Sequence, residues 1–363
     1  AIAPIQINGE SQVITYLEGE NKISINKSEK SSSRFTVSPA GISVAKGAKL
    51  TIDNEPGQQG SIEVLNNTNV DRSGAAIGGN GEQDAGIIHI KGGTVSATSA
   101  SKGAAIGASV GKSVEEIRIS GGNVTAKSSG GAGIGTGSAN SQKRAGKIVI
   151  EGGTVNASSW SGAGIGSGYG YVPGSSAIIA KIEIHGGMIT AYSEQGACIG
   201  SGNYSSSKVL IDGGTICLDN KDPGYRRVAH IGKGYDNSTL PQTDVTITGG
   251  TICLIGANGY NQRPIIYGWE QVDGKGQQNK PKDAKGNPVY YTTADLTGIY
   301  ENNTLVEKAG IEGSTYGFKD VRTDSNGKLY MYLPASDAVK ASFGGVEFTG
   351  KVEAGKDENV LER

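Results

Sequence analysis

The chain has 363 residues and a formal net charge of −1, from 34 Lys and Arg against 35 Asp and Glu, and 59 of its residues are glycine. The near-neutral balance argues against a nucleic-acid partner, which needs a clustered positive surface, and no apolar run approaches the roughly 20 residues of a membrane-spanning helix. The glycines do not recur at every third position, which excludes collagen, but they do recur in register with apolar residues, which argues against disorder.

Residues 1–70 are predicted as an N-terminal cap followed by irregular first turns of a repeat. The segment 14–26 (ITYLEGENKISIN) has the composition of a strand pair that could serve as the cap. Ile42, Val44, Leu50 and Ile52 form an early, irregular turn. Because the chain begins at Ala1 without an initiator Met, we expect that a leader has been removed.

Residues 71–255 carry two phrases that alternate along the chain. The first, Ala-x-Ile-Gly, has its isoleucine at Ile77, Ile106, Ile134, Ile165, Ile199 and Ile231. The second contains a glycine pair that begins at Gly92, Gly121, Gly152, Gly186, Gly213 and Gly249. The isoleucines are spaced 28 to 34 residues apart (134 − 106 = 28 and 199 − 165 = 34). A period of about 30 residues with variable spacers is typical of stacked repeats whose insertions lie in loops.

Each repeat is predicted to contain strands. In 87–97 (IIHIKGGTVSA), apolar and polar residues alternate on both sides of the glycine pair, which is the two-residue period of a strand with one buried side. About three short strands per turn of about 30 residues predict a parallel β-helix in which the isoleucines stack as a ladder. A β-propeller is the runner-up, but its blades need about 40–45 residues.

The pattern stops after Ile255. Residues 256–286 are polar and turn-rich, which predicts a linker or a covering loop. Residues 287–363 contain further strand-like runs, with a turn signal at 323–328 (TDSNGK), and are predicted as a small separate all-β module.

Three cysteines leave at least one unpaired. Cys217 and Cys253 follow equivalent glycine pairs, so they should lie on neighbouring turns about 4.8 Å apart. That spacing is compatible with a disulfide, although side chains on adjacent parallel strands seldom have the required orientation, which favours two thiols. Alternation places both on the outer face, which indicates that something covers the wall there.

The phrases GGTVSA, GAGIGTG and GAGIGSG, between about Gly74 and Leu254, resemble the Gly-rich right-handed parallel β-helix repeats of secreted and cell-surface bacterial proteins. Many members are adhesin-like or carbohydrate-binding. The resemblance implies an extracellular or cell-surface location and a polysaccharide or host glycoconjugate as partner. The wider β-helix class also includes polysaccharide lyases and glycoside hydrolases, so the fold alone leaves the activity open.

One candidate site is the column of residues before the glycine pairs. Glu151, His185 and Asp212 should lie one above another, with Glu183 nearby. Two carboxylates around a histidine are suited to acid–base catalysis or cation binding. Glu151 and Asp212 would be about 10 Å apart, near the upper end of the carboxylate separation in inverting glycosidases. A solvated column of mixed side chains accounts for the same pattern.

A second column lies between the Ala and the Ile of the first phrase. Alternation predicts that it faces outward, and most of its members are Ala or Gly. It brings Cys198 beside His230, which resembles a nucleophile–base pair without a third group to orient it.

A third column is aromatic. Tyr169, Tyr204 and Tyr235 follow the ladder isoleucine on three consecutive turns, Tyr171 is adjacent, and Trp160 and Tyr192 occupy the preceding loops. Aromatic faces spaced along the axis are suited to stacking on sugar rings. The alternative is that the rings pack on one another or against the C-terminal module.

The sequence therefore favours a non-catalytic extracellular protein that binds polysaccharide or glycoconjugate along the β-helix. A polysaccharide lyase or glycoside hydrolase centred on Glu151, Glu183, His185 and Asp212 is the first alternative, and a purely structural surface spacer is the second. No cofactor is predicted. No His and Cys spacing fits a zinc site, and 273–276 and 324–327 resemble calcium loops but lack the further carboxylates.

Overall fold

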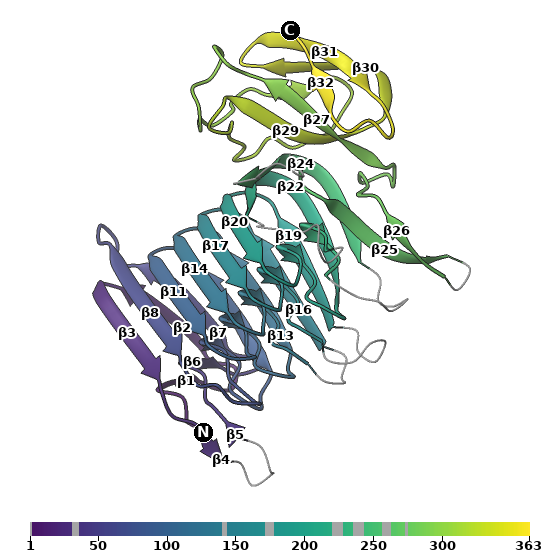
Figure 1. The fold of residues 1–363 in the computed structure, drawn as a ribbon. Coiled ribbons are helices and arrows are strands. Elements are labelled where there is room, and N and C mark those ends of the chain that lie inside the picture. The colour runs from purple at the N-terminus through teal and green to yellow at the C-terminus, as the bar shows by residue number, and fades with distance from the viewer. Residues whose placement is uncertain are drawn as a thin grey trace.

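The computed structural model describes residues 2–30, 36–139, 144–170, 178–219, 228–234, 243–255, 263–272 and 275–363. Every regular element among these residues is a β-strand. The strands wind into a parallel β-helix with three faces, and a small β module follows at its C-terminal end (Figure 1). The predicted fold class is confirmed.

The first face is built from the strands that precede the glycine pairs. They are β2 (Gln12–Leu17), β7 (Lys49–Asn54), β10 (Ala85–Ile90), β13 (Val114–Ile119), β16 (Arg144–Ile150), β19 (Ile178–Ile184) and the first halves of β22 (Ser206–Asp219) and β24 (Asp244–Ile255). Neighbouring strands pair in parallel. Their inward side chains are the alternate apolar residues that the sequence pattern predicts, such as Ile88 and Ile90, which are fully buried.

The second face is built from the strands that follow the glycine pairs. They are β3 (Gly19–Ile25), β8 (Gly60–Asn66), β11 (Thr94–Ser99), β14 (Asn123–Ser128), β17 (Thr154–Ser159), β20 (Met188–Ser193) and the second halves of β22 and β24. These strands also pair in parallel. Both β22 and β24 continue through the glycine corner. The first and second faces therefore form one 14-stranded sheet, which includes β24 as the neighbour of β22.

The third face, here called the isoleucine face, is narrow. Its strands are β1 (Ile5–Ile7), β6 (Ile42–Val44), β9 (Ile77–Gly78), β12 (Ile106–Gly107), β15 (Ile134–Gly135), β18 (Ile165–Gly166), β21 (Ile199–Gly200), β23 (Ile231–Gly232) and β25 (Ile266–Val272). The predicted isoleucines pair directly with one another from turn to turn. The ladder is also longer than predicted, because Ile5 and Ile42 extend it at one end and Ile266 at the other.

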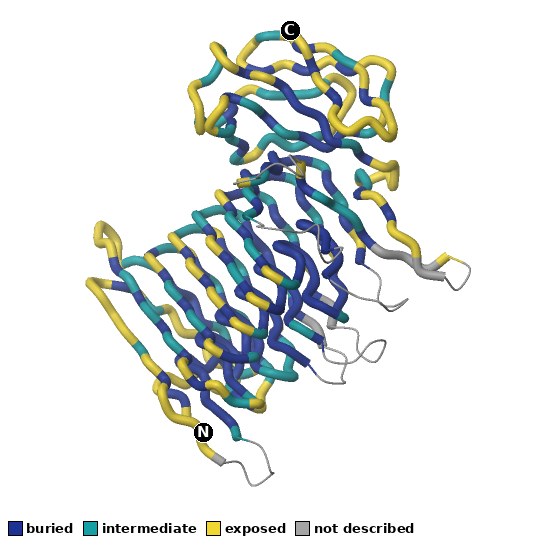
Figure 2. The backbone as a smooth tube through the Cα atoms, in the orientation of Figure 1, coloured by how far each residue is buried: buried dark blue, intermediate teal, exposed yellow. Residues whose placement is uncertain are grey.

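The core is a continuous column of Ile, Val, Leu and Ala side chains between the three faces. Figure 2 shows buried and exposed residues alternating along the strands of the 14-stranded sheet, as expected for strands with one side in the core and the other in solvent. The narrow core explains how a chain with only 6% aromatic residues can bury enough surface, since stacked aliphatic residues fill it.

The N-terminal segment differs from the predicted strand pair. β2 pairs with β7 and β3 pairs with β8, so each extends a different face, and β1 extends the isoleucine face. These three strands form one more turn of the coil. Apolar alternation predicts the strands but does not distinguish a hairpin from two strands that each pair with a later turn.

The segment 256–286, predicted as a linker or covering loop, also contains strands. β25 continues the isoleucine face by pairing Ile266 with Ile231. It then pairs antiparallel with β26 (Lys275–Asn279). A β-strand here was not expected because the segment lacks the repeat phrases.

The C-terminal module consists of two three-stranded sheets. One contains β27 (Val289–Asp295), β29 (Lys328–Pro334) and β32 (Asn359–Leu361), and the other contains β28 (Gly310–Ile311), β30 (Ser336–Phe343) and β31 (Val346–Val352). Phe343 and Phe348 pack edge to face in the core of the module, with 5.4 Å between their ring centroids. Val289, Tyr291 and Tyr332 belong instead to the β-helix core. The module therefore covers the end of the coil, which a solenoid requires.

The segment before β29 also attaches to the glycine corners of the last turns. Gly250 N donates to Gly317 O at 2.8 Å, and Gly214 N donates to Lys319 O at 2.7 Å. Asp320 accepts a hydrogen bond from Gly187 N at 3.2 Å through its carboxylate. Backbone groups that would otherwise point into solvent at the bend are thus paired by the module.

Cys217 and Cys253 lie opposite each other on β22 and β24, as the repeat register predicts. Both are free thiols, with 2.8 Å between the two Sγ atoms. The expected cover on the outer wall is present, because Tyr330 N of β29 donates to Thr251 Oγ1 at 3.0 Å beside them. Cys253 is accordingly only 8% exposed although it faces outward.

Candidate functional site

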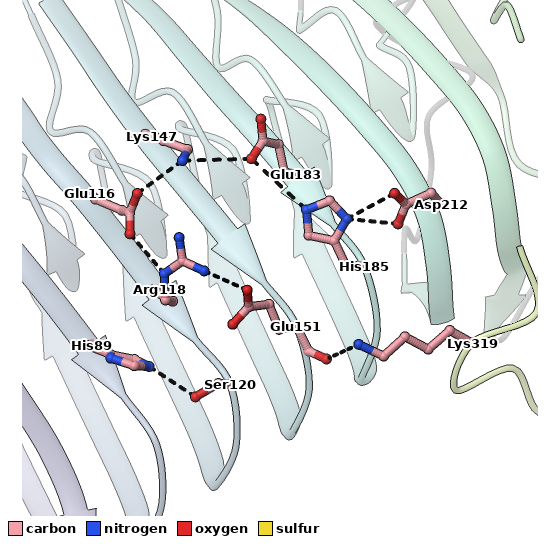
Figure 3. Close-up of polar contacts among 10 residues, drawn as sticks. All are labelled: His89, Glu116, Arg118, Ser120, Lys147, Glu151, Glu183, His185, Asp212 and Lys319. Carbon is pink, nitrogen blue, oxygen red and sulfur yellow. Dashed lines mark hydrogen bonds and ion pairs between the residues drawn. The ribbon is translucent and has the colours of Figure 1, made fainter. Parts of the chain in front are cut away.

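The first candidate site lies on the outer wall of the first face, where β19 and β22 reach the glycine corner (Figure 3). Ile184 pairs with Ile211, so the next residues, His185 and Asp212, are neighbours. His185 Nδ1 lies 2.8 and 3.0 Å from the two carboxylate oxygens of Asp212, and its Nε2 lies 4.0 Å from Glu183 Oε2. The structure thus brings together three of the four residues proposed for catalysis.

The fourth residue, Glu151, is directed away from the histidine. Its Oε1 lies 2.5 Å from Arg118 Nη1 on the preceding turn, and its carbonyl oxygen accepts a hydrogen bond from Lys319 Nζ at 3.4 Å. Figure 3 shows both contacts. The column prediction placed Glu151 correctly along the axis, but it did not include the basic side chains that compete for the carboxylate.

Lysine side chains also form ion pairs with Glu183 and Glu116 on this wall. Lys181 Nζ lies 2.6 Å from Glu183 Oε1, and Lys147 lies between Glu183 and Glu116, at 3.9 and 3.0 Å. The hydrogen bond from Lys181 lowers the pKa of Glu183 below its ordinary value, with further contributions from Lys147 and His185. Sequence reasoning missed Lys147 and Arg118; the available signal was that the outward positions two and four residues before the glycine-pair column carry charged side chains of both signs, with Lys147 beside Lys181 and Val149 beside Glu183.

The second candidate column does not face outward, so the prediction of a flat outer strip is wrong. Ala76, Ala105 and Cys198 are 0% exposed and belong to the core, and His230 is 1% exposed. Alternation failed because the Ile-Gly strands of this face are only two residues long, and the glycine that ends each of these strands, such as Gly78 with φ of 132°, turns the chain sharply. Burial raises the pKa of the Cys198 thiol to about 12. A nucleophile–base pair needs an accessible thiolate, which this site does not provide.

His230 has a structural role that predicts a pH dependence of stability. Its Nδ1 accepts a hydrogen bond from Ile265 N at 2.8 Å, and burial lowers the pKa of His230 from 6.5 to about 4. The unfolded chain therefore binds a proton between pH 6.5 and 4 that the folded chain excludes, and stability falls as the pH decreases through this window.

We expect this group to reduce the free energy of unfolding by about 2 kcal/mol between pH 7 and pH 5. Urea unfolding at both pH values measures the loss, and His230→Gln, which retains an acceptor for Ile265 N, should show a smaller one. Equal losses in the two proteins would contradict the assignment. The comparison is needed because the pKa of the partly buried His89 is also lowered, chiefly by burial.

The aromatic column is only partly described, because Tyr171 and Tyr235 lie outside the described residues. Tyr169 and Tyr204 pack on each other edge to face, with 6.4 Å between ring centroids. Trp160 is 54% exposed at the end of β17, and Tyr192 is half-buried on β20 of the next turn. Ser161 N donates to Ser129 O and Tyr169 N donates to Gly130 O, so the two ends of the segment 161–169 lie beside adjacent residues of the preceding turn.

The fold places the protein in the class of parallel β-helices with repeated turns. The charged and aromatic candidate residues lie on the outer surface of the coil. Four segments of the chain match a family model described as a beta helix repeat, at residues 88–110, 117–138, 148–169 and 182–203. These four segments are therefore similar to beta helix repeats, in agreement with the parallel coil that their strands form. No curated protein and no solved structure matches the chain.

The described residues contain no group of three or more His, Cys, Asp and Glu side chains that could hold a metal ion. No helix long and apolar enough to cross a membrane occurs among them.

Proposed function

We propose that the protein is a non-catalytic extracellular or cell-surface protein that binds polysaccharide or a glycoconjugate along its β-helix. The observation that carries this proposal is the exposed indole of Trp160 on a rigid coil, one turn away from Tyr192. An exposed large aromatic side chain on a preorganised surface provides contact area at little entropic cost, which is suited to the faces of sugar rings.

The polar residues beside these rings support the same function. Ser158 pairs with Tyr192 in the second face, and Asn156 pairs with Thr190. The outer wall next to Trp160 therefore presents hydroxyl and amide groups that can exchange hydrogen bonds with sugar hydroxyls. Polar side chains continue on the preceding turn, where Thr125 and Lys127 pair with Asn156 and Ser158 at a spacing of about 4.8 Å, so an extended ligand can contact several turns at once.

The ion pairs of the first face favour binding over catalysis. A carboxyl group that acts as a general acid needs a raised pKa, whereas Lys181 lowers that of Glu183, and Arg118 holds Glu151 at 2.5 Å. One observation favours the alternative of a lyase or hydrolase: Asp212 orients His185, as a partner of a catalytic base does. An assay for unsaturated or reducing-end products from acidic and neutral polysaccharides tests this alternative, which requires turnover that His185→Ala abolishes.

We expect Trp160→Ala to weaken polysaccharide binding by about tenfold or more, because it removes the exposed indole ring that is proposed to contact the sugar. Affinity electrophoresis in gels that contain individual polysaccharides, after a glycan-array screen, measures the effect. Met188→Ala is the matched control, since Met188 is 46% exposed on the same wall and carries no ring. Equal retardation of both variants, or retardation of neither the variants nor the parent protein by any glycan, would contradict the proposal, and the latter result would favour a structural spacer.

A further inference from the structure

A cavity of about 320 Å³ lies between the last turn of the β-helix and the C-terminal module. Pro264 and Ile266 line it from the coil, and Val289, Tyr290 and Tyr332 line it from the module. Cavities between structural units are common ligand sites, and this volume is near the lower end of their usual range, which corresponds to one or two sugar-sized rings. The cavity lies three turns beyond the turn of Trp160, since β21 and β23 separate β18 from β25, and Trp160 does not line it.

The tyrosines of the cavity are held in place. Tyr291 and Tyr332 are 7% and 4% exposed, and their rings pack edge to face with 5.7 Å between the ring centroids. Tyr291 also stacks on Tyr330 at 5.9 Å, and the Tyr332 hydroxyl donates to Pro264 O at 3.3 Å. A ligand therefore finds a preformed aromatic wall and does not have to order it, which lowers the cost of binding.

The charged residues that line the cavity are all basic: Arg263, Lys280 and Lys356. Lys280 Nζ lies 5.1 Å from the centroid of the Tyr290 ring. Arg263 is held by Asp357, whose carboxylate lies 2.5 Å from Nη2 and whose carbonyl oxygen accepts from Nη1 at 2.6 Å. Asp357 is outside the cavity lining and 91% exposed in its side chain. The cavity thus combines a positive rim with an aromatic wall.

We propose that this cavity binds an acidic sugar residue, whose carboxylate contacts Lys280 and Arg263 and whose ring lies against Tyr290 and Tyr291. The tyrosines are suited to a ring that carries hydroxyl groups, because each has an apolar face and a polar tip. A neutral sugar offers Lys280 no carboxylate and leaves Arg263 with Asp357 alone. Asp357 competes with the ligand carboxylate for Arg263, so it limits the affinity.

Saturation-transfer NMR of the full chain with D-glucuronic acid tests the proposal, with D-glucose as the matched neutral sugar. We expect glucuronate to bind about tenfold more tightly than glucose and its affinity to fall as salt is added. Equal binding of the two sugars would overturn the proposal. Benzoate separates an acidic sugar from any aromatic acid: if it displaces glucuronate at lower concentration than glucuronate itself binds, the sugar assignment is wrong.

Three exposed positions locate the site without disturbing the core. Lys280→Gln should reduce glucuronate affinity about tenfold. Lys285→Gln, which removes the same charge from outside the cavity lining, should leave the affinity unchanged. Asp357→Asn should increase the affinity at least about twofold, because it removes the negative charge that competes with the ligand carboxylate for Arg263. Equal losses in the two lysine variants, or a weaker complex in Asp357→Asn, would place the anion elsewhere and overturn the proposal.

Discussion

Gly166→Ala is expected to lower the free energy of unfolding by about 4 kcal/mol or more. Gly166 has φ of 137°, a conformation that L side chains rarely adopt, and its added Cβ would lie 1.9 Å from Gly200 O of the next turn. The backbone strain alone costs about 1–3 kcal/mol, and the clash is with a main-chain atom that is itself part of the stacked sheet. The turns must therefore separate, and separation disrupts the isoleucine ladder on both sides.

Urea unfolding followed by circular dichroism measures this loss. Gly310→Ala is the matched control, because Gly310 lies in a strand where a Cβ meets nothing within 4 Å. We expect the control to change the free energy of unfolding by less than about 0.5 kcal/mol. A cost below about 1 kcal/mol for Gly166→Ala would contradict the close stacking of the Ile-Gly strands.

Ile165→Ala has the second largest expected effect, a loss of about 2–5 kcal/mol in the free energy of unfolding. Ile165 is fully buried, with Ile134 before it and Ile199 after it in the ladder. Truncation leaves a cavity that the rigid neighbouring turns cannot close. Because each turn contacts only its neighbours, the destabilisation should begin at this position and spread from it.

The same substitution at the end of the same ladder provides the control. Ile5 pairs with Ile42 but is 45% exposed, so Ile5→Ala removes fewer contacts and leaves no closed cavity. We expect it to cost less than about 1 kcal/mol. Similar costs at the two positions would mean that burial in the ladder does not stabilise the coil.

The candidate site was predictable where it depends on register alone. The spacing of the glycine pairs places His185 beside Asp212, and their contact at 2.8 Å confirms that placement. The ion pair between Arg118 and Glu151 was not predicted, because it joins different columns of adjacent turns and depends on the length and direction of two side chains. The Cys198 and His230 column was placed on the wrong side, because two-residue strands are too short for alternation to define a face.

The repeat phrases by themselves determined the β-helix, the vertical neighbours in each column and the stacked isoleucines, because a period of about 30 residues imposes the same register on every turn. Only the tertiary structure decided how the coil ends and what its end can bind. The C-terminal module, the cavity beneath it and the contact between Arg263 and Asp357 join segments far apart in the chain that follow no common repeat. Such contacts depend on the packing of two complete units, and no local pattern of residues records that packing.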